Sequence, residues 1–440
     1  MANQVVPPRG MRDFLPHEFA VRQHVLAIMA QVVREHGFHQ IHTPSLELIE
    51  RLKSNKGGEN ESMLFEVLKR GLDPEVPLTP AEAVDLGLRY DLTLPLTRYY
   101  ATHQAELPAI FKAVQTGSVW RAERPQKGRY REFTQFDMDI IGEETSRAEI
   151  ELISVGYAIL QRLGLGQSTV IINDRRILSD IMDYAGIAEE QRGSVLISLD
   201  KQDKIGEDGV KTELTEKVGL SADSVDRLFA RIHELESLDI AEYAQQHSDG
   251  HGDGHGDGHG DDVDTVNLYE LPATVAAVTA LNPGIRISFA PTLVRGMGYY
   301  TGLIYEVVND TYGKSVCGGG RYDNMIGDWS GKPVPAAGFS FGFERIMDIV
   351  DPALIGAGER GLGLAYGTDE EFTAALKLRA QLLSEGSWDT VALVKRPKKL
   401  KASFFDLLTS LGLSAWLDMS VDGLLGEVDS HVKPVDKPVN

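Results

Sequence analysis

The stretch from Trp120 to Gly142 combines a basic turn with a segment patterned like a β-strand. Five basic side chains surround a turn that contains Pro125 and Gly128, namely Arg121, Arg124, Lys127, Arg129 and Arg131. Four further residues alternate along the chain and are expected on one face of a strand: Phe133, Gln135, Asp137 and Asp139. Guanidinium groups bind phosphates, an aromatic ring can stack on a purine, and amide and carboxyl groups can bind a small polar ligand. The pattern predicts a hairpin that binds a nucleotide beside a small polar molecule, and the alternative is a surface hairpin with a solvated charge run.

A second candidate lies in LRYDLTLPLTRYYA, residues 88–101. We expect Asp91 and Thr93 on one strand face, just before a helix that Pro95 can begin. A carboxylate beside a hydroxyl suits the binding of an ammonium group. The alternative is that Asp91 or Thr93 caps the helix.

Three glycine-containing segments follow. Residues 290–307 read as strands around a turn with the pattern RGxxYYTG, which contains Arg295, Tyr299 and Tyr300. Residues 318–327, GGGRYDNMIG, combine backbone freedom with an arginine and a tyrosine. Residues 335–350 predict a strand that enters a helix through Gly342, and Arg345 at that helix start favours an anion.

In this order, the segments resemble the motifs of class II aminoacyl-tRNA synthetases, and in particular the histidyl-tRNA synthetase family. RGMRDFLP, the helix predicted from Phe19 to about His36, and FHQIHTPSLELIE with its Pro44 resemble motif 1 and its dimer-forming element. The basic hairpin resembles motif 2, RGxxYYTG resembles the histidine signature, and GFER resembles motif 3. One position departs from the pattern, because many family members have an acid where this chain has Gly298.

The resemblance implies a two-step reaction with ATP and Mg²⁺, in which histidine forms histidyl-adenylate and is then transferred to the 3′ end of tRNA(His). It implies that Arg121 and Arg295 are catalytic and hold the α-phosphate. The implied histidine-binding residues are Asp91, Thr93, Gln135, Asp139, Tyr299 and Tyr300. The implied ATP-binding residues are Arg121, Glu123, Phe133 and Arg345. Gln126 is implied to contact the tRNA, and no metal ligand is assigned.

The implied fold is α+β, with an antiparallel sheet flanked by helices, a helical insertion and a C-terminal α/β domain. We expect catalytic segments at 1–165 and 265–355, the insertion at 166–264, and at 356–440 an α/β module in the position of the family's anticodon-binding domain. The insertion looks helical, with caps at Asp174 and Asp208, and it contains the run HSDGHGDGHGDGHGDD. That run is interpreted as a flexible loop that captures metal only adventitiously, or else as a loose metal site.

Bulk composition narrows the class of protein. The 440 residues are 42% hydrophobic and carry a net charge of −21, with basic clusters at 121–131 and 395–401. An acidic body with two basic patches fits a transient nucleic-acid partner. The single Cys317, and the lack of a signal-peptide or membrane-spanning run, favour the cytoplasm without membrane contact, and the resemblance to motif 1 implies a homodimer. The alternative function is a catalytically silent relative, a histidine-sensing regulatory subunit of ATP phosphoribosyltransferase.

Overall fold

The computed structural model describes residues 5–53, 63–73, 75, 77–126, 128–240, 242–243, 267–294, 299–351, 360–420 and 428–435. Arg295 and the histidine-rich run at 247–262 lie outside these residues. The chain divides into two compact units, one formed by 1–12 and 28–350 and the other by 13–27 and 351–440. None of the described helices is long and apolar enough to cross a membrane.

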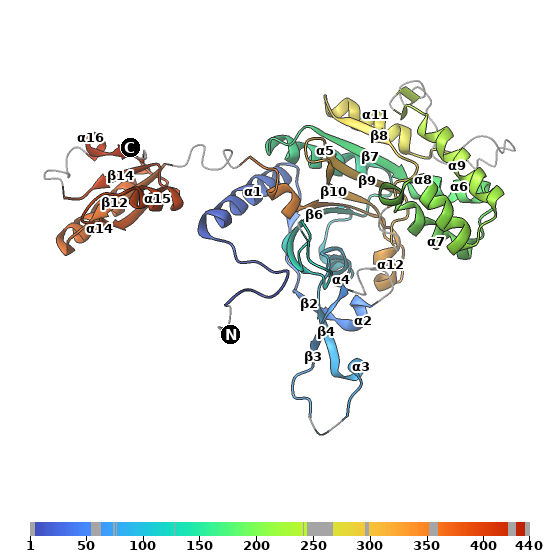
Figure 1. Ribbon diagram of the computed structural model, residues 1–440, viewed down its shortest axis with the longest axis horizontal. Coiled ribbons are helices and arrows are strands. Elements are labelled where there is room, and N and C mark those ends of the chain that lie inside the picture. Colours follow the sequence, from blue (N-terminus) through green and yellow to red (C-terminus); the bar gives the residue numbers. More distant parts are fainter. Residues whose placement is uncertain are drawn as a thin grey trace. The chain divides into compact units, whose positions relative to one another are not determined.

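The first unit is built on an eight-stranded sheet of order β1-β5-β6-β11-β10-β9-β7-β8 (Figure 1). Its strands are β1 (His39–Gln40), β5 (Phe111–Trp120), β6 (Glu132–Ile141), β7 (Ser168–Asp174), β8 (Arg286–Phe289), β9 (Leu303–Asn309), β10 (Lys314–Arg321) and β11 (Ala336–Gly342). The pairs from β5 to β7 are antiparallel, while β1 and β8 join the two edges in parallel. The predicted antiparallel sheet of an α+β fold is confirmed.

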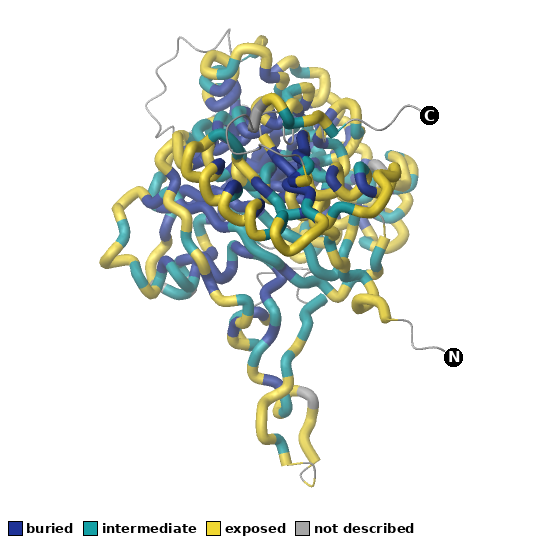
Figure 2. The backbone as a smooth tube through the Cα atoms, turned by 90° about the vertical axis from the view of Figure 1, so that its left-hand side faces the viewer, coloured by how far each residue is buried: buried dark blue, intermediate teal, exposed yellow. Residues whose placement is uncertain are grey.

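One face of this sheet is apolar and covered by helices. Helix α5 (Arg147–Arg162) packs on β6 and β11, and α11 (Leu271–Leu281) packs on α5. Gly156 of α5 lies against the Phe339 ring, where a Cβ would overlap it. Tyr305 and Phe339 form the interior beneath the helix. The dark segments in Figure 2 follow this buried layer. The opposite face carries the polar residues of β6, beside an apolar cluster that includes Phe111 and Ile141, and it is called the open face below.

The predicted motif 1 segment forms a helix and two short strands. Helix α1 (Pro16–Glu35) ends before Gly37, which has a positive φ of 78°. Strands β1 and β2 (Leu46–Leu48) lie on either side of Pro44, and β2 forms a three-stranded sheet with β4 (Val84–Leu88) and β3 (Phe65–Leu68). Strands β2, β3 and β4 lie below the large sheet in Figure 1, with the short helices α2 (Ile49–Leu52) and α3 (Pro80–Ala83) beside them.

Arg89 fastens this segment to the large sheet. Its buried guanidinium donates to the Thr43 and Pro44 carbonyl oxygens at 2.8 and 3.4 Å, and to the Ser118 carbonyl at 3.0 Å. A Cβ at Gly117 would overlap the Arg89 guanidinium, so the glycine makes room for it. The Arg89 hydrogen bonds fix the chain that leads into helix α4 (Thr93–His103).

Two details of the sequence interpretation are wrong here. Strand β4 ends at Leu88, so Asp91 and Thr93 do not share a strand face. Instead, Asp91 accepts a hydrogen bond from the Leu94 N–H at 3.1 Å, and Thr93 is the first residue of α4. Asp208 lies inside α8 and caps nothing, whereas Asp174 caps α6 by accepting from the Arg176 N–H.

The segment predicted as a helical insertion begins with β7, which belongs to the large sheet, because its apolar alternation is that of a strand. The helices follow as α6 (Arg175–Tyr184), α7 (Glu189–Leu199), α8 (Gln202–Glu213), the π-helical turn η3 (Leu214–Val218) and α9 (Ala222–Glu236). The domain boundaries themselves stay a prediction. The unit also contains η2 (Gln104–Glu106), α12 (Asn324–Ser330) and α13 (Phe343–Met347).

The second unit has the predicted strand–helix–strand–helix–strand order. It contains β12 (Gly361–Tyr366), α14 (Asp369–Glu385), β13 (Thr390–Lys395), α15 (Ala402–Ser410), β14 (Ala415–Asp418), α16 (Val428–His431) and β15 (Lys433–Pro434). The basic run at 395–401 follows β13, and its lysines are exposed. Arg396 differs from them because its guanidinium pairs with Glu371 and Asp418.

A buried ion pair ties β10 to α5. The Arg321 guanidinium donates to both Glu149 oxygens at 2.7 Å and to the Thr145 carbonyl at 2.7 Å. Arg321 therefore has a structural role, and it does not belong to the site suggested by the GGGRYD pattern. Removing one partner of a buried pair leaves an uncompensated charge.

We predict that Glu149→Ala lowers the free energy of unfolding by about 3–5 kcal/mol in urea denaturation. The control is Glu35→Gln, which breaks the exposed pair with Arg162 (side chains 40% and 45% exposed) and should lower the free energy of unfolding far less. Equal losses in the two variants would show that Arg321 is not held as described.

Candidate functional site

The open face of the sheet carries a row of polar side chains among very small neighbours. Asp139 on β6 is flanked by Ala113 on β5 and by Gly338 on β11. Gln135 is flanked in the same way by Gly117 and Gly342. A Cβ at Gly338 would overlap the Asp139 carboxyl. A Cβ at Gly117 would likewise overlap the Arg89 guanidinium, so these small residues make room for the polar side chains beside them.

Asp139 is anchored by a tyrosine from the end of β10. The Tyr322 hydroxyl donates to Asp139 Oδ1 at 2.6 Å, and both side chains are buried. Asp139 Oδ2 is also buried and has no hydrogen-bond partner among the described residues. Burial raises the pKa of Asp139 to about 7, although the Tyr322 hydrogen bond lowers it. One carboxyl oxygen is thus held in place, and the other remains available to a ligand.

Two further aromatic residues lie at the same end of the sheet. Tyr299 and Tyr300 have ring centroids 4.4 Å apart and pack against the buried cluster that contains Tyr90 and Tyr322. The structure therefore brings the predicted tyrosine pair to the Asp139 end. The Tyr322 hydrogen bond escaped the sequence interpretation. A tyrosine directly after a glycine-rich strand was its only signal.

Arg121 and Asp91 form a second part of the site. The Arg121 side chain donates from Nε to the Tyr90 carbonyl at 3.0 Å, next to Asp91. Burial raises the pKa of Asp91, whereas the Leu94 N–H and the guanidinium groups of Arg121 and Arg89 lower it. A carboxyl group at a helix start, close to an arginine, can bind the ammonium end of an amino acid. The capping alternative agrees with the hydrogen bond that Asp91 accepts from the first turn of α4, whose N-cap residue is Leu92.

Between these parts, Gln135 and Asp137 are joined through Ser340 of β11. The Ser340 hydroxyl donates to Asp137 Oδ1 at 2.5 Å, and Gln135 Nε2 donates to the Ser340 hydroxyl at 3.2 Å. Gln135 Oε1 is buried and has no partner among the described residues. Burial, with the nearby Asp139 and Asp91, raises the pKa of Asp137 well above its usual value. Ser340 had no signal in the sequence other than its alternation along the strand.

The hairpin turn holds the remaining motif 2 residues. The Gln126 and Arg129 backbones pair across Gly128, which has a φ of 78°, so a tight turn forms as predicted. Arg121 lies over the Phe133 ring, with the guanidinium carbon 5.1 Å from the ring centroid. Glu123 pairs with Arg129 at 3.5 Å, and Gln126 is exposed at the tip. These residues line up beyond Gln135, away from Asp139.

Arg345 sits at the start of α13, which follows β11 through Gly342 as predicted. Its guanidinium donates to the Ser315 carbonyl at 2.7 Å. The residue before it, Glu344, accepts hydrogen bonds from Arg12 at 2.5 Å and from the Thr134 N–H at 3.2 Å. These bonds join α13 to β6 and to the RGMRDFLP segment.

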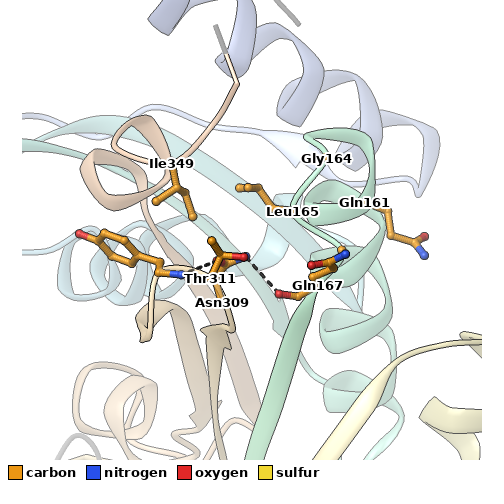
Figure 3. Close-up of a pocket in the computed structure, with 9 residues that line it drawn as sticks. Gln161, Gly164, Leu165, Gln167, Asn309, Thr311 and Ile349 are labelled. Carbon is orange, nitrogen blue, oxygen red and sulfur yellow. Dashed lines mark hydrogen bonds between the residues drawn. The ribbon is translucent and has the colours of Figure 1, made fainter. Parts of the chain in front are cut away.

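A pocket of about 650 Å³ opens elsewhere on this unit (Figure 3). It lies between the end of α5 and the β9–β10 turn, where Asn309 Nδ2 donates to the Gln167 carbonyl at 3.2 Å. None of the predicted site residues lines it. It contains no charged side chain, so we assign it no role in the chemistry.

The raised pKa of Asp139 yields a prediction for stability against pH. Since the folded protein holds this proton up to a pH of about 7 and the unfolded chain only to about 4, the contribution of Asp139 to stability is full below pH 4 and is lost as the pH rises to 7. The slope is at most about 1.4 kcal/mol per pH unit. Asp139→Asn should therefore gain stability relative to the wild type between pH 5 and pH 7.5. Urea denaturation at several pH values measures this, and a difference that does not change with pH contradicts it.

Comparisons with known proteins agree with the motifs. The family model described as histidyl-tRNA synthetase matches residues 10–346. A histidine–tRNA ligase of Leifsonia xyli is 44% identical over 91% of this chain and 92% of its own. A probable histidine–tRNA ligase of Tropheryma whipplei is 37% identical over 97% of this chain and 99% of its own.

Solved structures share the fold. A histidyl-tRNA synthetase from Nostoc sp. PCC 7120 superposes with a TM-score of 0.71 at 24% identity, covering 94% of this chain and 91% of its own. A Bacillus halodurans protein, titled ATP phosphoribosyltransferase regulatory subunit/histidyl-tRNA synthetase, superposes with a TM-score of 0.69 at 22% identity, covering 94% of this chain and 97% of its own.

Proposed function

The chain belongs to the histidyl-tRNA synthetase family, and we propose that it joins histidine to tRNA(His) with ATP through the residues of the open sheet face. It is an aminoacyl-tRNA ligase, as its relatives over most of the chain indicate. The observation that carries the residue assignment is the buried Asp139 carboxyl, one oxygen of which is held by Tyr322 while the other has no partner among the described residues.

At this end of the site, Asp139 accepts a hydrogen bond from the imidazole ring of histidine. Tyr299 and Tyr300 line the ring, and Tyr300 with Asp139 hydrogen-bonds its two nitrogens. A pocket that hydrogen-bonds both ring nitrogens rejects apolar analogues by about 10⁴-fold, because such ligands leave its buried polar groups unpaired. Asp91, Thr93 and Gln135 bind the amino group of the substrate, for which acidic and amide oxygens are suitable acceptors.

At the other end, ATP lies along the basic hairpin. Arg121 holds the α-phosphate and stabilises the charge that develops as the histidine carboxylate attacks the α-phosphorus. Phe133 stacks on the adenine ring, Glu123 accepts from its amino group, and Arg345 binds the γ-phosphate. Arg295, outside the described residues, is proposed as the second catalytic arginine from its motif alone. Pyrophosphate leaves, and the terminal tRNA hydroxyl then attacks the histidyl carbonyl.

We also propose a metal ion, a tRNA contact, an oligomeric state and a cellular location. Mg²⁺ arrives with the ATP phosphates, and we assign it no protein ligand, since the described residues contain no group of three or more potential ligands. Gln126, exposed at the hairpin tip, contacts the tRNA. A homodimer formed through motif 1 is supported by Leu46 and Leu48, which are both 41% exposed on the edge strand β2. The proposed location is the cytoplasm.

The regulatory alternative is not favoured. The T. whipplei relative matches 97% of this chain, C-terminal unit included, and is named a probable ligase. The chain also keeps Arg121 on the basic hairpin and Arg345 in α13.

The function is tested by pyrophosphate exchange. We expect the purified protein to exchange labelled pyrophosphate into ATP when histidine is present, and to charge tRNA(His) afterwards. Exchange should require histidine and fail with other amino acids. A protein that binds histidine but exchanges no label under saturating substrates would instead be a regulatory relative.

Arg121→Ala tests the phosphate end. Loss of one donor to a developing charge lowers the rate about 10²–10³-fold, so exchange should fall by that factor while histidine binding changes little. Arg129→Ala is the matched control from the same hairpin, because its side chain is 51% exposed. If both variants exchange at wild-type rates, Arg121 has been given the wrong role.

A further inference from the structure

Asp137 is a buried acid in the centre of the site that the proposed reaction does not use. It is 3% exposed, and Gln115 on β5 and Ser340 on β11 are its cross-strand neighbours. The Gln115 amide is engaged elsewhere, since its Nε2 donates to the Leu92 carbonyl at 3.0 Å and its Oε1 accepts from Thr43 at 3.0 Å. An apolar side chain at this position would cost less free energy on folding, because a buried carboxyl must be desolvated.

The hydrogen bonds of Asp137 have a direction. A hydroxyl group has one proton, and Ser340 gives its proton to Asp137 Oδ1 at 2.5 Å. The Ser340 oxygen can then only accept, and it accepts from Gln135 Nε2 at 3.2 Å. A side-chain amide with its nitrogen on one side has its oxygen on the other. Gln135 Oε1 is accordingly the atom left without a partner.

We propose that Asp137 and Ser340 are positioning residues that fix the amide of Gln135 with its oxygen toward the histidine ammonium group. The proposal rests on the function proposed above and adds two residues that touch no substrate. Without Asp137, the Ser340 proton is free to bond Gln135 Oε1, and the amide can turn its NH₂ group toward the ammonium. Two donors would then face each other, which weakens histidine binding without altering the reacting phosphate.

The test is a double-mutant cycle in the histidine-dependent exchange assay. Asp137→Ala and Ser340→Ala should each raise KM for histidine by about tenfold, the usual worth of one buried hydrogen bond to a charged group. Both should leave kcat and KM for ATP within about twofold. Ser340→Thr keeps the hydroxyl and should restore the wild-type KM. The double variant should lose no more than either single variant, because both act through one amide.

The matched control is Ser118→Ala on β5, since Ser118 pairs with Thr134 and so lies on the opposite face of the sheet. It should leave KM for histidine unchanged. Pyrophosphate exchange by the wild-type protein tests the proposed function itself. Failure of that function and failure of the present proposal therefore give different results. If the wild type exchanges but the Ser340→Ala and Ser340→Thr variants have the same KM for histidine, the proposal is overturned. Losses that add in the double variant overturn it as well. Should Asp137→Ala fail to fold, the Ser340 pair still decides.

Discussion

Carboxyl groups buried on one face of a sheet impose the constraint on which this site depends. Asp137 and Asp139 lie on the sheet face, and Asp91 beside them raises the pKa of both, while Asp139 also raises that of Asp137, so these acids need partners that are fixed by the fold. Tyr322, Ser340 and the start of α4 supply those partners. Asp139 Oδ2 and Gln135 Oε1 are left buried without a partner among the described residues. We propose that these acceptors bind the polar groups of histidine, next to arginines that can hold phosphates.

The buried Arg89 explains how this face is kept in register with the motif 1 segment. Arg89 bonds the backbone of the motif 1 segment to that of β5, and the Trp120 N–H bonds back to the Arg89 carbonyl. The chain then runs through Tyr90, whose carbonyl accepts from Arg121, to Asp91. One buried guanidinium therefore connects the proposed dimer segment with both the ammonium-binding and the phosphate-binding parts of the site. The Arg321–Glu149 pair performs the same task for β10, because it fixes the strand from which Tyr322 extends.

The sequence was sufficient for the hairpin, the strand-to-helix step at Gly342 and the order of the C-terminal module. These features depend on local alternation, glycine and proline. It was insufficient for interactions that need a particular register between distant strands. Ser340 meets Asp137, and Tyr322 meets Asp139, only once β10, β11 and β6 are paired. The strand given to Asp91 failed because a helix cap and a strand end share the same residue types. Strand β7 was hidden because it directly precedes a helix. The roles of all the site residues stay predictions.

The central claim is that the open face orients histidine by its two ends, with the imidazole at Asp139 and the ammonium group at Gln135 and Asp91. A crystal structure of the protein with bound histidine tests this most directly. We expect an imidazole nitrogen within about 3 Å of Asp139 Oδ2, and the ammonium nitrogen within the same distance of Gln135 Oε1. Histidine bound with its ring away from Asp139, or in the pocket beside Asn309, would contradict the account.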